Sequence, residues 1–190
     1  MARPREFDVE VAVDRAKELF WRHGFNGTSI SDLTAELGVG PGSLYAAFGS
    51  KEGLYARALG RYCDEQAGDL LMALESSDDI RSTLREVLVG LVEMDLAEPR
   101  GCFLVNAATE RDDDDTTIER IALNLRQVES ALAGSLERAV ANGDLGAEKD
   151  PAALARFFTT FIQGLRVMGQ ARSGRAFALS AVDTALAALD

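Results

Sequence analysis

Residues 28–54 read TSISDLTAELGVGPGSLYAAFGSKEGL, and this stretch decides the fold of the N-terminal part of the chain. Its apolar residues fall into two short blocks with the spacing of amphipathic helices. Ser29 with Asp32 resembles a capping box for the first block, and the glycine-rich residues 38–42 break the chain before the second. The pattern therefore predicts a helix-turn-helix. Its buried residues are expected to be Ile30, Leu33, Leu37, Val39, Leu44 and Phe48.

Helices are also predicted on both sides of this motif. Asp8 caps a helix that ends near Gly24, and Ser50 caps a fourth helix that starts at Lys51. Five more helices follow, and Thr116 with Glu119 fits a capping box for the longest of them. No alternating strand pattern separates the turn signals, so we expect an all-α fold of about nine helices. We divide it into a helix-turn-helix domain, residues 1–55, and a C-terminal helical domain, residues 56–190.

The charge of the chain is distributed unevenly. Residues 1–61 contain eight Lys or Arg and eight Asp or Glu, so the net charge of −11 belongs entirely to residues 62–190. A neutral N-terminal part can approach DNA while the acidic remainder is held away from it. We expect modest non-specific affinity and a dependence on local contacts.

The composition also disfavours several other classes of protein. Two cysteines and one histidine are too few for a disulfide scaffold or a four-ligand zinc site, and we expect no cofactor. We find no phosphate loop or nucleophile elbow, so an enzyme is disfavoured. Cys102 is interpreted as packing rather than a redox sensor, and residues 112–115 as a solvated turn rather than a cation site. No signal peptide or membrane span is recognised, so a cytoplasmic protein is expected.

Small residues open the second helix of the motif. Pro41, Gly42 and Ser43 have little bulk, so backbone and hydroxyl groups there can approach bases or phosphates. Tyr45 places a phenol about one turn further along, and Lys51 stands at the next helix start, where an ammonium can face a phosphate. Arg3 and Arg5 are interpreted in two ways, as an arm that reaches DNA or as a solvated terminus.

The motif resembles the DNA-binding signature of TetR-type regulators. The matching pattern is T-S-I-x-D-L-x-x-x-L-G-V-x-x-G-S-L-Y-x-x-F-x-S-K-E-x-L, preceded by Ala16-x-x-Leu19-Phe20-x-x-x-Gly24-Phe25, and it covers roughly residues 8–60. The resemblance implies that Ser43 and Tyr45 contact double-stranded DNA beside Pro41 and Gly42, and that Ser29 and Lys51 grip phosphates. Ala46-Ala47 departs from members that place a polar residue after the tyrosine.

The resemblance further implies that the C-terminal domain binds a small molecule and forms a homodimer through its last two helices, about residues 150–189. A wide apolar arc on the first of these helices agrees with cover from two sides. The expected pocket residues are Tyr62, Phe103, Asn106, Phe158 and Ile162. For Asn106 and its neighbour Glu110, capping or surface roles remain open.

Together these features favour a ligand-responsive transcriptional repressor that a small molecule releases from a near-palindromic operator. The alternative is a ligand-independent DNA-binding or partner-recruiting protein. The two hypotheses share the N-terminal motif and differ in whether the C-terminal domain holds a ligand cavity.

Overall fold

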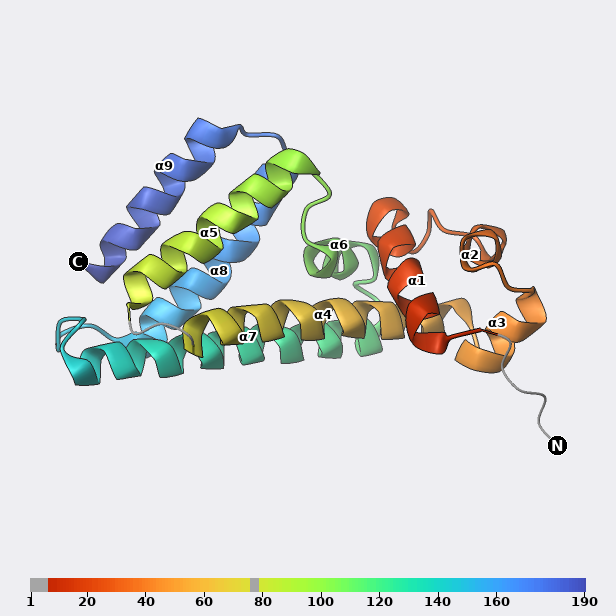
Figure 1. The fold of residues 1–190 in the computed structure, drawn as a ribbon, viewed down its shortest axis with the longest axis horizontal. Helices are drawn as coiled ribbons and strands as arrows, with labels where there is room; N and C mark the ends of the chain where they lie inside the picture. The colour runs from red at the N-terminus through yellow and green to blue at the C-terminus, as the bar shows by residue number, and fades with distance from the viewer. Residues whose placement is uncertain (1–6, 76–78) are drawn as a thin grey trace.

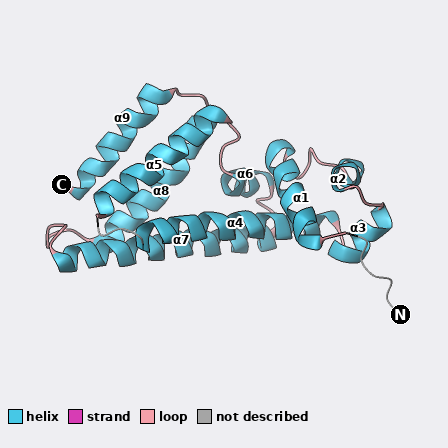
Figure 2. Ribbon diagram, viewed as in Figure 1, coloured by secondary structure: helices cyan, strands magenta, loops and turns pink. Residues whose placement is uncertain are grey.

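The computed structural model describes residues 7–75 and 79–190, and these residues form nine α-helices and one short 3-10 helix without any strand (Figures 1 and 2). The all-α fold predicted from the sequence is confirmed. Arg3 and Arg5 lie outside the described residues. The helices are α1 (Val9–His23), α2 (Ile30–Leu37), α3 (Pro41–Phe48), α4 (Lys51–Glu75), α5 (Ile80–Ala97), α6 (Phe103–Glu110), α7 (Asp115–Asn142), α8 (Pro151–Gln170), α9 (Arg175–Leu186) and the 3-10 helix η1 (Ala187–Leu189).

The helix-turn-helix is formed by α2 and α3. The Ser29 hydroxyl accepts the backbone N–H of Asp32, and the Asp32 carboxylate accepts the N–H of Ser29, so the predicted capping box is confirmed. Gly38 ends α2 with a φ of 67°, a left-handed conformation that glycine adopts without steric cost. Pro41 then occupies the first turn of α3, where its missing N–H costs no hydrogen bond.

The start of α7 differs from the prediction. The helix begins at Asp115 with Asp114 as its N-cap residue, so the capping box expected at Thr116 and Glu119 is wrong. The Asp114 carboxylate instead accepts the hydroxyl of Thr117 and pairs with Arg111. These bonds hold the turn before α7 in place. The helix therefore begins among the acidic residues, one residue earlier than Thr116.

The helices surround two separate hydrophobic cores. In Figure 1, α4 and α7 run side by side along the molecule, α1–α3 lie at one end, and α5, α8 and α9 lean together at the other. We call the cluster of buried residues from α1–α3, the first half of α4, α6 and the start of α7 the N-terminal core. The cluster from the end of α4 and from α5, α7, α8 and α9 is the C-terminal core. The division proposed between residues 55 and 56 falls inside α4, which serves both cores.

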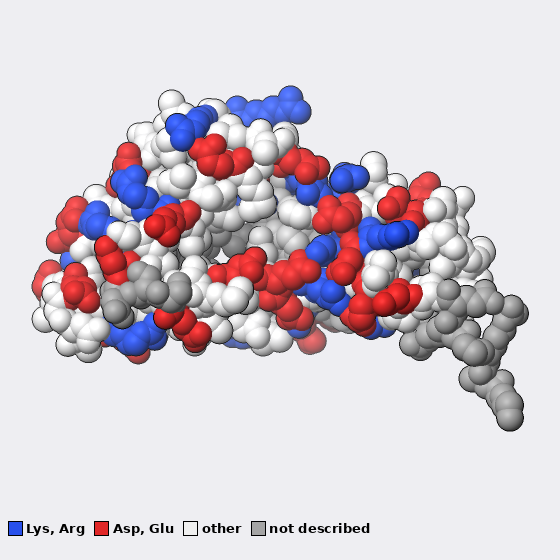
Figure 3. Space-filling model, in the orientation of Figure 1, with Lys and Arg blue, Asp and Glu red and all other residues white. Residues whose placement is uncertain are grey.

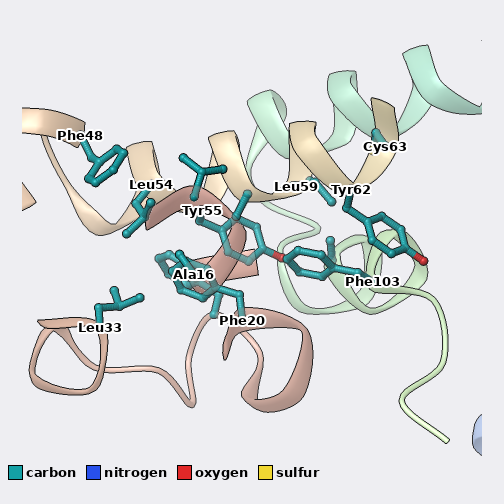
Figure 4. Packing of buried hydrophobic residues seen from close by; sticks show 14 of the residues in the cluster. Ala16, Phe20, Leu33, Phe48, Leu54, Tyr55, Leu59, Tyr62, Cys63 and Phe103 are labelled. Atoms are coloured by element: carbon teal, nitrogen blue, oxygen red, sulfur yellow. The ribbon is translucent and has the colours of Figure 1, made fainter. Parts of the chain in front are cut away.

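The N-terminal core is dominated by aromatic rings (Figure 4). Tyr55 packs edge-on against Phe20, Phe25 and Phe103, at ring-centroid distances of 5.0, 5.1 and 5.5 Å. Tyr62 adds a further edge-on contact with Phe103 at 5.6 Å. Such interlocking rings stabilise a fixed geometry beyond the area that they bury. They join α1, α4 and α6 into one body that carries α2 and α3.

Candidate nucleic-acid interface

One side of α3 is buried and the other is open. Leu44 and Phe48 are 0% and 8% exposed, whereas Tyr45 between them is 47% exposed. Pro41, Gly42 and Ser43 are exposed in the first turn of the same helix. No hydrogen bond among the described residues engages the Tyr45 phenol. The structure therefore brings four of the sequence-predicted contact residues onto one exposed surface.

Ser29 and Lys51 flank this surface in different ways. Ser29 is exposed at the start of α2, although its hydroxyl already serves the capping box. Lys51 is half-buried, and its ammonium donates to the carbonyl oxygens of Phe25 and Thr28 at 2.9 and 3.0 Å. An ammonium has three donors, so one remains for a phosphate. The first function of Lys51 in the structure is to fasten the start of α4 to the connection between α1 and α2.

The sequence analysis missed how strongly the α1–α2 connection is fastened. The Glu110 carboxylate, at the end of α6, accepts the backbone N–H groups of Phe25 and Asn26 at 2.8 and 2.7 Å. The Phe25 ring lies between two cations, with the Lys51 ammonium 3.9 Å and the Arg111 guanidinium 4.0 Å from its centroid. No local signal reveals these contacts, because 26 residues of chain separate Lys51 from Phe25 and about 85 separate Glu110 from it.

The basic residues near the motif are internally neutralised. No Lys or Arg occurs between residues 23 and 50. In the described part of residues 7–61, every Lys and Arg has a partner within the chain: Arg15 with the Glu36 carbonyl, Lys17 with Glu65, Arg22 with Glu98, Lys51 with two carbonyls, Arg57 with Glu10, and Arg61 with Glu10 and Asp14. Figure 3 shows that the end carrying α2 and α3 is largely uncharged on this face.

The five residues expected to line an effector pocket do not come together. Tyr62 and Phe103 are buried in the N-terminal core, with the Tyr62 hydroxyl donating to the Cys102 sulfur at 3.4 Å. The Asn106 amide donates to the Arg100 carbonyl, and Phe158 is completely buried in the C-terminal core. Ile162 lines a cavity of about 180 Å³ between α4, α5, α7 and α8.

Two further features bear on chemistry. Burial raises the pKa of the Cys63 thiol to about 11, so this buried cysteine is protonated at neutral pH. Within residues 7–75 and 79–190, the side chains of His, Cys, Asp and Glu form no group that could hold a metal ion.

None of the described helices is both long and apolar enough to cross a membrane.

Family models match both parts of the chain. The model described as bacterial regulatory proteins of the tetR family matches residues 12–58, and the tetracyclin repressor-like C-terminal domain matches residues 80–182. The chain is 32% identical to the HTH-type transcriptional repressor ComR of Escherichia coli, over 90% of this chain and 83% of ComR. It is 29% identical to the uncharacterized HTH-type transcriptional regulator YezE of Bacillus subtilis, over the full length of both.

Solved structures agree with these matches. A cysteine mutant of the TetR family transcriptional regulator CifR, in complex with 26-base-pair double-strand operator DNA and apo-CifR, superposes with a TM-score of 0.87 at 34% identity. The match covers 99% of this chain and 100% of that one. The reduced form of Escherichia coli NemR, at 22% identity and a TM-score of 0.80, shares the fold. The chain therefore belongs to the TetR family of bacterial regulatory proteins and is a DNA-binding transcriptional regulator.

Proposed function

We propose that the protein is a homodimeric repressor that binds a near-palindromic operator in the cytoplasm and leaves it when a small molecule binds. The observation that carries the DNA-binding part is the exposed face of α3, where Tyr45 projects from a helix anchored by buried Leu44 and Phe48. The similarity to ComR, a repressor, and to CifR bound to operator DNA supports the same function.

The proposed contacts divide into two kinds. Ser43 and Tyr45 face base edges in the major groove, with Pro41 and Gly42 allowing close approach of the backbone. Ser29 and the remaining donor of Lys51 face phosphates. Since the described basic residues of this region already have partners, sequence-specific contacts must contribute a large share of the affinity.

The proposed dimer forms through α8 and α9. Phe157 and Phe177, on these two helices, are 41% and 52% exposed, which is unusual for rings of this size. Together with Phe161 they line an apolar groove of about 470 Å³. A second copy of the chain would cover this surface. Phe177→Glu should therefore convert the dimer into a monomer, as measured by light scattering after gel filtration, whereas Arg175→Glu nearby should not.

The proposed effector site is the cavity beside α4 that Ile162 lines. Gln163 also lines it, and its side-chain oxygen is buried without a hydrogen-bond partner among the described residues. A ligand there would contact α4, the helix that continues into the N-terminal core. The alternative, a ligand-independent regulator, predicts that no compound filling this cavity changes operator affinity.

The test is selection of the full-length protein against randomised duplex DNA, followed by titration of the enriched sequence at several salt concentrations. We expect a near-palindrome with half-sites about one helical turn apart. The slope of log K against log salt should be shallower than about −6, because few cations are free to displace counterions at about 0.9 per phosphate. Binding that is indifferent to sequence would contradict the proposal.

A further inference from the structure

A second cavity lies where the end of α5 meets α8 and the start of α9. Its volume is about 320 Å³, within the range of sites for small ligands. Most of its wall is apolar. The polar side chains in the wall are those of Asp95, Arg172 and Ser173. The lining consists of Val92, Asp95, Leu96, Pro99, Leu165, Gly169, Arg172, Ser173, Gly174 and Ala178.

Two polar side chains of this wall, Asp95 and Ser173, lack hydrogen-bond partners. Asp95 is 3% exposed, and neither of its carboxylate oxygens has a hydrogen-bond partner among the described residues. The Ser173 hydroxyl is likewise buried and unpartnered. Buried acceptors in native proteins are almost always satisfied, so such a group at a cavity wall indicates a missing donor.

Arg166 forms an ion pair with the carboxylate but gives it no hydrogen bond. Its Nη2 atom lies 3.4 Å from Oδ1 of Asp95, but it donates to the carbonyl of Gly101 at 2.6 Å. The second oxygen of Asp95 lies beside Gly169, where a side chain would not fit: a Cβ would come within 2.5 Å of Oδ2. The bare backbone of Gly169 thus lets α8 pack directly against the Asp95 side chain, at the wall of the cavity that both residues line.

These features define the chemistry of a ligand. A carboxylate and a hydroxyl in an apolar cavity require donors, and an ammonium group supplies up to three of them together with the opposite charge. The negative charge of Asp95 would repel an anion. A plain hydrocarbon would leave the Asp95 carboxylate and the Ser173 hydroxyl without hydrogen-bond partners. Burial raises the pKa of Asp95 above its ordinary value, and a cation at hydrogen-bond distance would favour its ionised form.

We propose that this cavity binds a small apolar primary amine, whose ammonium group donates to Asp95 and Ser173 and whose body packs against Val92, Leu165 and Ala178. The site is separate from the effector cavity beside α4, and no residue lines both. Arg172 is exposed at the edge of the cavity, where solvent screens its charge.

Arg166, the ion-pair partner of Asp95, connects this site to the DNA-binding end. The Gly101 carbonyl accepts Nη2 of Arg166 at 2.6 Å and the indole N–H of Trp21, on α1, at 3.1 Å. Gly101 itself admits no side chain, since its φ is +69° and a Cβ would lie 2.7 Å from Oε1 of Gln170. An amine that draws Asp95 away from Arg166 therefore acts on a residue bonded, through one carbonyl, to α1. This coupling rests on the proposed function as an operator-binding regulator.

The test is isothermal titration of the full-length protein, without DNA, with phenethylamine as the probe. The neutral 2-phenylethanol and the anionic 3-phenylpropionate are the matched ligands. We expect saturable binding of one phenethylamine per chain and binding weaker by about tenfold or more for the other two. Equal binding of 2-phenylethanol would overturn the role of the carboxylate.

Two variants locate the site. Asp95→Asn should abolish phenethylamine binding while it preserves the shape of the side chain. Ala178→Leu, which narrows the cavity from the side of α9 and leaves Asp95 and Arg166 unchanged, should also abolish binding and is the independent test if Asp95→Asn does not fold. Ala187→Leu, at the exposed first residue of η1, is the control and should bind normally. Normal binding by folded Ala178→Leu would overturn the site.

Operator titration with and without phenethylamine tests the coupling separately. We expect the amine to change the operator affinity of the wild-type protein and not that of Ala178→Leu. Amine binding with unchanged operator affinity would overturn the coupling alone, whereas failure to bind any operator would contradict the proposed function and leave the calorimetric result intact.

Discussion

The two cores of this protein differ in how they treat polar groups. In the N-terminal core the carboxylate of Glu110, the ammonium of Lys51 and the indole of Trp21 each bond to a backbone group at a connection between helices. Buried side-chain oxygens without hydrogen-bond partners among the described residues are concentrated at the other end: Asp95, Gln163, Thr159 and Ser173 have them there, against Tyr55 alone in the N-terminal core.

This difference agrees with the two tasks of a regulator. A surface that reads DNA must hold its contact residues in one geometry, and hydrogen bonds to the connections between helices, together with interlocked rings, achieve that. A domain that senses a ligand needs groups that only the ligand satisfies, together with space to admit it. The predictions below test whether the first region is rigid and whether the second is poised for binding.

The largest expected effect concerns the buried pair of the C-terminal core. Arg166→Met removes the cation beside Asp95 and leaves a carboxylate with no compensating charge. We expect a loss of about 3–5 kcal/mol in the free energy of unfolding, measured by denaturant titration. The double variant Asp95→Leu, Arg166→Met should recover much of that loss. A single variant as stable as the wild type would mean that water or another group already satisfies Asp95.

A smaller effect is expected at the DNA-reading surface. Tyr45→Ala removes an exposed side chain that packs against no core, so the unfolding temperature should not change. Operator affinity should fall by about 1–3 kcal/mol for each recognition helix, measured by fluorescence anisotropy at fixed salt. Tyr45→Phe separates the hydroxyl from the ring. If both variants kept wild-type affinity, Tyr45 would not contact DNA.

The next prediction asks whether α6 holds the helix-turn-helix in place. Glu110→Gln keeps the shape of the side chain but leaves one acceptor oxygen, so one of the bonds from the Phe25 and Asn26 N–H groups becomes neutral and the other is lost. We expect a loss of about 1 kcal/mol in stability, together with faster amide hydrogen exchange at residues 25 and 26. Glu119→Gln, on the exposed side of α7, is the control. Unchanged hydrogen exchange at both amides would contradict the interpretation that Glu110 holds the helix-turn-helix in one geometry.

The smallest expected effect concerns the pKa of Asp32 in the capping box of α2. The side-chain and backbone hydrogen bonds from Ser29 hold the pKa of Asp32 below its ordinary value of 3.8. Because the folded-state pKa is lowered, the stability that Asp32 contributes is complete above pH 3.8 and is lost as pH falls through the folded-state pKa. NMR titration should show a midpoint below 3.8 that rises in Ser29→Ala.

Asp95 provides the opposite case. Burial raises its pKa, so the folded protein favours the protonated form, and the associated stability is present at low pH and lost as pH rises through the folded-state pKa. NMR titration should give Asp95 a higher titration midpoint than Asp32. A lower midpoint for Asp95 would contradict the opposite directions expected for the two pKa values.

Much of the reading surface was predictable because its determinants are local. The capping box of α2, the glycine at its end, the proline that opens α3 and the alternation of buried Leu44 with exposed Tyr45 all lie within one stretch. The spacing of apolar residues in a helix and the residues that form caps and turns act over a few positions. They can therefore be recognised in the sequence without a three-dimensional structure. The same holds for the all-helical class and for membership of the family.

The sequence by itself thus determined the helices, the motif and its exposed face. Only the tertiary structure decided how the charges are used: Lys51 bonds to carbonyls, Glu110 fastens a connection about 85 residues away, and Asp95 meets Arg166 inside the C-terminal core. It also separated the expected pocket residues between two cores. The physical reason is that hydrogen-bond partners and cavities depend on how helices distant in sequence pack, and local spacing carries no record of that packing.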